Sequence, residues 1–335
     1  MPSSDNSAPD SSDTKKSSAE RRQATLEDIE HRVEEARAQI DATTEKINKR
    51  VGRNLPAAIG IGATLGGLFL GSLLIPGWDW LFMILAALLI GFAVFELAGA
   101  LRFAGRDVPR VASTVLAVAT VPVGFYFGVE GLWLALLVVV AIVTLWRLGE
   151  QMRPSHRTGI RSVVADIGAG AFVQVYVTFL ACLYVVLVGL DVDGVDVGGE
   201  WWTVAGIVIV VMTDIGAYAF GLAFGRRKLA PTISPGKTVE GFIGSVLVAV
   251  LTGVLLTWIL PGLGQPWWVG AILGLLLALV GTMGDLTESL IKRDLGVKDI
   301  STWLPGHGGF LDRLDSMLPA AAVTYAAYLV VTSLS

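Results

Sequence analysis

The chain has 335 residues and a formal net charge of −4, and only 16% of its residues are charged. Hydrophobic residues make up 53% of it and the mean hydropathy is +0.66, whereas soluble domains carry about 25% charged residues. This composition excludes an ordinary soluble enzyme, a disordered chain and a nucleic-acid-binding protein, and the single cysteine excludes an internal disulfide.

The first 54 residues differ from the rest in composition. Residues 1–24, rich in Ser and Asp, predict a disordered cytoplasmic tail. Residues 25–54 predict an amphipathic cytoplasmic helix, because apolar positions recur in steps of three and four. This helix is either a short coiled coil or partner-binding helix, or a surface helix that lies on the membrane or on the protein. The repeat is formed by Leu26, Ile29, Val33, Ala36, Ile40, Thr43 and Ile47.

Residues 55–335 predict one membrane-embedded, all-helical domain. A spanning helix needs about 20 mostly apolar residues, and nine such segments follow one another along the chain. They lie near 56–76, 79–101, 109–128, 131–148, 162–190, 201–224, 239–260, 267–290 and 317–334. We therefore expect an all-α polytopic membrane protein with about nine transmembrane helices.

Basic residues mark one side of the membrane. All 15 Lys and Arg residues after Arg53 lie in or beside the connections that follow the second, fourth, sixth and eighth spans. The alternate connections carry acidic residues such as Asp79, Glu130 and Asp191. By the positive-inside rule the basic side is cytoplasmic, which places the N-terminus in the cytoplasm and the C-terminus outside. We expect a multi-pass protein of the cell (plasma or inner) membrane.

The densest polar cluster covers residues 284–316, where the eighth span ends. Its first group falls on one helix face and consists of Asp285, Glu288, Ser289 and Lys292. A glycine turn leads to the second group, which consists of His307, Gly308, Gly309, Asp312, Arg313 and Asp315. Mg²⁺ typically takes one or two carboxylates plus substrate phosphates, and Asp285 and Asp312 suit that role. The cluster predicts phosphoryl or nucleotidyl transfer at the cytoplasmic membrane face.

Within this cluster we assign catalysis to Asp285, Lys292, Asp312 and Asp315. Ser289, Arg293, Lys298, His307, Gly308, Gly309 and Arg313 are assigned to substrate binding. Basic side chains neutralise phosphates, and glycines allow backbone N–H groups to approach them closely. For His307 a substrate-binding or turn-shaping role is favoured over that of general base, because a phosphate monoester nucleophile is already anionic near neutral pH.

A second cluster covers residues 213–241, at the end of the sixth span and in the connection that follows. Asp214 and Tyr218 share one face of that span. Ser234, Lys237 and Thr238 follow in the connection and are assigned, with them, to substrate binding. Glu96, inside the second span, is either a structural hydrogen-bonding partner or a functional residue, since a buried charge there is costly.

The order and spacing of these residues resemble those of a known family. The segment from Ser289 to Asp315 resembles the signature of the phosphatidate cytidylyltransferases, the CDP-diacylglycerol synthases. The matching positions are Ser289, Ile291, Lys292, Arg293, Lys298, Asp299, Ser301, Leu304, Pro305, His307, Gly308, Gly309, Phe310, Asp312, Arg313, Leu314 and Asp315. The SP-x-KT-x-EG segment from Ser234 to Gly241 and the group Asp214, Ala217 and Tyr218 are also similar to family features. The resemblance covers residues 56–335.

The resemblance implies the reaction CTP + phosphatidic acid → CDP-diacylglycerol + pyrophosphate, in a site open to the cytoplasm and to lipid. It also implies Mg²⁺, with a monovalent cation such as K⁺ as its partner, held by Asp285 and Asp312, and a homodimer. Two other readings stay open. In the first, the chain is a cytidylyl- or phosphotransferase that acts on another membrane lipid. In the second, it is a cation-coupled transporter; against this reading, the polar residues gather at one membrane side and no internal repeat is evident.

Overall fold

The computed structural model describes residues 55–154, 157–190, 198–260, 263–297, 300 and 309–334. The chain divides into two units, residues 1–63 and 64–335. Of the first unit only the beginning of α2 (Leu55–Leu74) is described, without its side chains. The predicted tail over 1–24 and the predicted amphipathic helix over 25–54 therefore lie outside the described residues.

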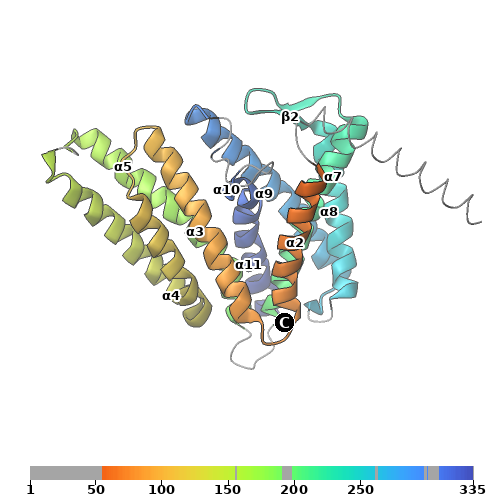
Figure 1. Ribbon diagram of the computed structural model, residues 1–335. Helices are drawn as coiled ribbons and strands as arrows, with labels where there is room; N and C mark the ends of the chain where they lie inside the picture. The colour runs from red at the N-terminus through yellow and green to blue at the C-terminus, as the bar shows by residue number, and fades with distance from the viewer. Residues whose placement is uncertain are drawn as a thin grey trace, which may run out of the picture. The chain divides into compact units, whose positions relative to one another are not determined.

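The second unit is built almost entirely from helices (Figure 1). They are α3 (Asp79–Phe103), α4 (Arg110–Glu150), α5 (Ile160–Val173), the π-helix η2 (Gln174–Phe179), α6 (Leu180–Gly189), α7 (Gly199–Phe224), α8 (Val239–Ile259), α9 (Trp267–Asp294), α10 (Leu311–Leu314) and α11 (Met317–Leu334). Among the described residues, seven helical stretches are long and apolar enough to cross a membrane. The expectation of a helical membrane protein is confirmed at this level.

The predicted spans over 109–128 and 131–148 fall within the single element α4, which has 41 residues. Its helical geometry breaks at Gly128, whose φ of 62° and ψ of −157° lie in a region that glycine tolerates because it has no Cβ. The chain reverses there, since residues from both ends of α4, such as Arg110 and Glu150, line one cavity. The two halves of α4 therefore run in opposite directions (Figure 1).

A short β-hairpin joins α7 to α8 and departs from the all-helical prediction. Its strands β1 (Lys228–Ala230) and β2 (Ser234–Thr238) pair antiparallel. Pro235 and Gly236 are poor strand formers, but Pro is tolerated on an edge strand, and both strands of a two-stranded ribbon are edges. The Glu240 carboxylate holds the base of the hairpin by accepting hydrogen bonds from the backbone N–H groups of Arg226 and Arg227, at 3.0 and 3.1 Å.

Close packing of α8 and α9 depends on glycines. A Cβ added to Gly253 in α8 would collide with the carbonyl of Gly270 in α9, and the reverse also holds. Gly274 approaches the Ala249 carbonyl in the same way. Small residues let helix backbones approach closely in membranes, where van der Waals packing drives association. This packing brings the polar ends of α8 and α9 together beside the hairpin (Figure 1).

Candidate active site

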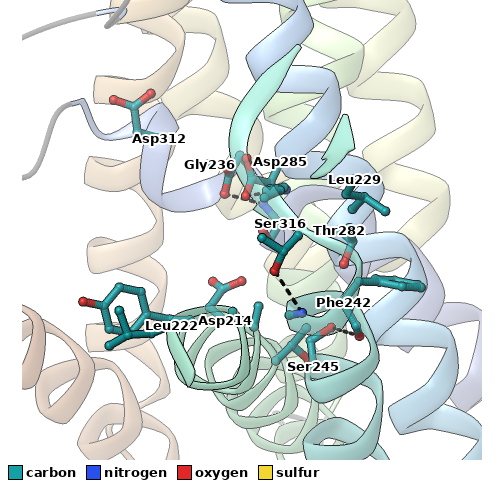
Figure 2. Close-up of a pocket in the computed structure, with 18 of the residues that line it drawn as sticks. Asp214, Leu222, Leu229, Gly236, Phe242, Ser245, Thr282, Asp285, Asp312 and Ser316 are labelled. Carbon is teal, nitrogen blue, oxygen red and sulfur yellow. Dashed lines mark hydrogen bonds and ion pairs between the residues drawn. The ribbon is translucent and has the colours of Figure 1, made fainter. Parts of the chain in front are cut away.

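A cavity of about 530 Å³ lies where α7, the hairpin, α8, α9 and α10 meet (Figure 2). Eight of the residues assigned from the sequence line it: Asp214, Tyr218, Lys237, Thr238, Asp285, Asp312, Arg313 and Asp315. They come from two clusters, residues 213–241 and 284–316, that are separate in the sequence. The fold therefore joins the two predicted clusters into one site.

Three carboxylates meet at one wall of this site. Oxygen atoms of Asp285, Glu288 and Asp315 all lie within 4.8 Å of one another. Glu288 is 1% exposed, and its Oε1 atom accepts no hydrogen bond from any residue in the described part of the chain. Carboxylates at this separation repel one another, and a cation bound among them would relieve that repulsion. This arrangement of hard oxygen ligands suits a cation such as Mg²⁺.

Two lysines approach the carboxylates from different elements. The Nζ atom of Lys237, on β2, lies 2.6 Å from the Asp285 Oδ2 atom. The Nζ atom of Lys292, on α9, lies 2.8 Å from Glu288 Oε2 and 3.0 Å from Asp312 Oδ1. Positive charge is thus placed on two sides of the carboxylate group, and of the two lysines Lys237 lines the cavity.

Asp312 occupies a different position from the other carboxylates. Its Oδ2 atom accepts a hydrogen bond from the Gly309 N–H group at 2.7 Å, and its Oδ1 atom contacts Lys292. Figure 2 shows its carboxylate directed away from the part of the cavity that holds Asp285. The structure therefore groups Asp285 with Glu288 and Asp315, while Asp312 closes the turn that leads into α10.

Apolar side chains line the cavity on two sides. Leu222 lies on the side of Asp214, and Leu229 and Phe242 lie on the other side (Figure 2); Leu222 is 75% exposed. Tyr218, on the same helix as Asp214, is 64% exposed. A cavity lined by charged groups and by exposed apolar side chains suits an amphiphilic molecule, such as a lipid with a phosphate headgroup.

The remaining assigned residues lie beside the cavity or outside the described part of the chain. Ser289 contacts the Asp285 carboxylate at 3.5 Å, and Arg293 donates to the Ile233 carbonyl at 3.4 Å. Ser234 pairs with Ala230 in the hairpin. Lys298, His307 and Gly308 lie outside the described residues.

Two carboxylates of this region, Glu288 and Glu96, lie outside the catalytic and substrate-binding assignments made from the sequence. Glu288 lies on the predicted helix face, and its spacing of three from Asp285 was the signal that pointed to it. Glu96 comes from α3, far away in the sequence, where no motif spacing indicates a contact. Its buried carboxylate accepts a hydrogen bond from the Leu311 N–H group at 3.0 Å. One turn earlier on α3, Phe92 stacks on Phe310 with ring centroids 4.6 Å apart, so α3 holds the start of α10.

The fold is that of a multi-pass membrane protein. Its cavity, at the ends of the helices, has side chains that suit a cation and a phosphate. The model of the cytidylyltransferase family matches residues 56–331. The chain belongs to this family, which confirms the resemblance carried by residues 289–315 and makes the protein a nucleotidyltransferase.

Relatives with high similarity are bacterial enzymes named phosphatidate cytidylyltransferase. The one from Mycobacterium bovis is 34% identical over 290 residues, which cover 85% of this chain and 90% of the relative. The one from Mycobacterium leprae is 34% identical over 84% of this chain and 89% of the relative. The one from Synechocystis is 47% identical over 125 residues, which cover 37% of this chain and 41% of the relative.

Proposed function

We propose that this protein transfers the cytidylyl group of CTP to phosphatidic acid, giving CDP-diacylglycerol and pyrophosphate. The observation that carries the proposal is that clustered carboxylates, two nearby lysines and the exposed side chains of Tyr218 and Leu222 occur together at one cavity. Family membership supplies the reaction class, and relatives that align over most of the chain carry the name of this reaction.

In this reaction a phosphate oxygen of phosphatidate attacks the α-phosphorus of CTP. One P–O bond forms, the bond between the α-phosphorus and its bridging oxygen to the β-phosphate breaks, and pyrophosphate leaves with that electron pair. Both reactants are anionic, so positioned cations are the main requirement. We assign phosphate binding to Lys237 and Arg313, which line the cavity together with Thr238 and Asp214.

We assign the metal to the group of Asp285, Glu288 and Asp315, with Asp312 as a further candidate ligand. The unpartnered Oε1 atom of buried Glu288 supports a cation there. Bound Mg²⁺ would reduce the repulsion between the two anionic reactants. The choice of Mg²⁺ and of K⁺ as its partner comes from the family resemblance, as does the homodimer.

We further propose nine membrane spans, with the active site facing the cytoplasm of the plasma or inner membrane. The break at Gly128 supports counting α4 as two spans, and apolar α2 supplies one more than the seven described stretches. With this count the basic connections, the hairpin and the carboxylate group all lie on the cytoplasmic side, as the positive-inside rule requires.

The test is product formation by the purified protein in detergent micelles that contain phosphatidate, with CTP, Mg²⁺ and K⁺ supplied. We expect CDP-diacylglycerol and pyrophosphate from the wild type, and a loss of about 10²-fold or more in Asp285→Asn and Asp312→Asn. Arg161→Gln, which changes an exposed charge at the start of α5, is the matched control.

Each alternative predicts a different result. Activity confined to another lipid phosphate or alcohol in a substrate panel would identify a transferase with another acceptor. Cation-dependent solute flux in liposomes without nucleotide would identify a transporter. Near-wild-type turnover in both aspartate variants would remove these residues from the site.

A further inference from the structure

A second cavity, of about 470 Å³, lies between α3 and the two ends of α4 and shares no lining residue with the candidate active site. It is formed where α3 ends, where α4 begins and where α4 ends. Two arginines, Arg102 and Arg110, and one carboxylate, Glu150, line it. The proposed reaction leaves this cavity without a role.

One side of the cavity presents a fixed guanidinium group. The Nε atom of Arg110 donates to the Phe95 carbonyl at 2.9 Å, and its central carbon lies 3.5 Å from the centroid of the Phe95 ring. Gly99 permits this position, since a Cβ there would lie 2.9 Å from the same carbon. The bond to Phe95 uses the Nε atom of Arg110, and the Nη1 atom of Arg102 donates to the Val108 carbonyl at 3.5 Å. Together the two arginines form a site for a phosphate, which arginine binds bidentately.

The other side presents a carboxylate that lacks a donor. Glu150 Oε1 accepts a hydrogen bond from the Trp146 indole N–H group at 3.0 Å. Its Oε2 atom is buried and accepts no hydrogen bond from any described residue. A group with N–H or O–H bonds can satisfy it. A primary ammonium supplies such donors, whereas a quaternary ammonium has no N–H to donate.

Exposed apolar side chains continue from the cavity along both halves of α4. The first stripe consists of Val111, Val115 and Val118, which are 68%, 60% and 39% exposed. The second consists of Trp146, Ile142 and Val138, which are 52%, 39% and 49% exposed. Residues at these spacings share a helix face. Two apolar stripes next to a polar cavity suit the two acyl chains of a lipid. A water-soluble molecule with a phosphate and an amine has no acyl chains to occupy them.

We infer that this cavity binds the headgroup of a zwitterionic phospholipid that carries a primary amine. Arg102 and Arg110 contact its phosphate, Glu150 contacts its ammonium group, and its acyl chains lie along the two stripes of α4. The site is separate from that of phosphatidate, whose headgroup has no amine, and the inference does not depend on the proposed reaction.

Native mass spectrometry of the full-length, delipidated protein tests this inference. The probes are phosphatidylethanolamine, phosphatidylcholine and phosphatidylglycerol with identical acyl chains. We expect the wild type to retain phosphatidylethanolamine about tenfold better than phosphatidylcholine, because a hydrogen bond to a charged group contributes on that order. Glu150→Gln should abolish this preference, and Arg110→Gln should weaken the binding of all three lipids.

Arg161→Gln is the matched control, because it removes an exposed arginine that does not line this cavity. Equal retention of the three lipids by the wild type would overturn the inference, as would an unchanged preference in Glu150→Gln. Displacement of the lipid by inorganic phosphate alone would show a simple anion site instead. The near-isosteric Glu150→Gln variant keeps the test decisive even if Arg110→Gln fails to fold.

Discussion

At the scale of single residues, the two lysines of the active-site cavity have different partners. Lys237 reaches Asp285 from the hairpin, whereas Lys292 lies between Glu288 and Asp312 on the other side. Lys237 is 22% exposed and lines the cavity, so an incoming phosphate competes with Asp285 for it. Lys292 does not line the cavity and is held by two carboxylates. These positions predict a binding role for Lys237 and a role in ordering the carboxylates for Lys292.

Lys237→Ala should therefore raise the KM for one of the two substrates about tenfold or more, as the loss of a charge-assisted contact to phosphate would. Steady-state kinetics with CTP and phosphatidate varied in turn measure this effect. Lys228→Ala, an exposed lysine of the same hairpin outside the cavity, should leave both KM values unchanged. Unchanged kinetics in Lys237→Ala would remove this lysine from the site.

Glu288 provides a test of the carboxylate group itself. Glu288→Gln removes one negative charge from three carboxylates whose oxygens lie within 4.8 Å of one another. The Mg²⁺ concentration for half-maximal activity should therefore rise by about tenfold or more, which is the usual effect of removing a group that supports a metal site. Thr287→Ala, an exposed neighbour on the same turn, is the control. An identical Mg²⁺ dependence in both variants would show that Glu288 does not contribute to cation binding.

These residues also show how far the sequence predicts the site. Spacing placed Asp285, Glu288 and Lys292 on one face, and charge and glycine content marked Asp312 and Asp315. Spacing cannot show which oxygens converge, because that depends on the packing of α9 against α11 and on the position of α10. The contact of Glu96 with Leu311 joins residues 215 positions apart, so no local pattern indicates it.

At the scale of the elements, glycine contacts set the position of the carboxylates. Gly284 precedes Asp285 on α9, and a Cβ there would collide with the Asp315 carbonyl and lie 2.7 Å from Pro319. The approach of α9 to the start of α11 therefore depends on this glycine. Because Asp285 and Asp315 belong to one carboxylate group, the same contact fixes the distance between them.

Gly284→Ala should reduce kcat by about a hundredfold, because a displacement of about 1 Å of catalytic groups costs that much. Gly281→Ala is a matched control one turn earlier on the same helix, where an added Cβ would lie an ordinary 3.7 Å from Ser316. Kinetics and thermal unfolding of both variants measure the difference. Equal kcat values in the two variants would show that this close approach does not position the site.

The sequence predicts the positions of the helices better than it predicts the hairpin. The predicted spans 201–224 and 267–290 correspond to Gly199–Phe224 and Trp267–Asp294, because long apolar segments determine these helices. The strand Ser234–Thr238 has the sequence SPGKT, which carries turn residues and no strand pattern. Its conformation depends on pairing with β1 and on the hydrogen bonds of Glu240 to the hairpin base, which are tertiary interactions.

At the scale of the whole chain, the described spans alternate in direction from α3 onward, with the two halves of α4 counted separately and α5, η2 and α6 counted as one stretch. Both polar cavities therefore lie at the same ends of these helices as the hairpin, where the basic residues are concentrated (Figure 1). This arrangement is what a lipid-modifying enzyme requires, because CTP arrives from water and phosphatidate from the bilayer. It depends on α4 crossing the membrane twice, since a single crossing would reverse every later helix.

Cysteine labelling tests this topology directly, because Cys182, the only cysteine, is fully buried. Single exposed cysteines are introduced by Arg106→Cys, Glu130→Cys, Thr232→Cys and Ser333→Cys. A membrane-impermeant maleimide added to intact cells should label positions 130 and 333, and should label 106 and 232 only after permeabilisation. The positive-inside rule and the break at Gly128 together require this pattern. Labelling of 106 and 130 from the same side would show that α4 does not form two spans, and the active site would then no longer share a membrane face with the basic connection after α3.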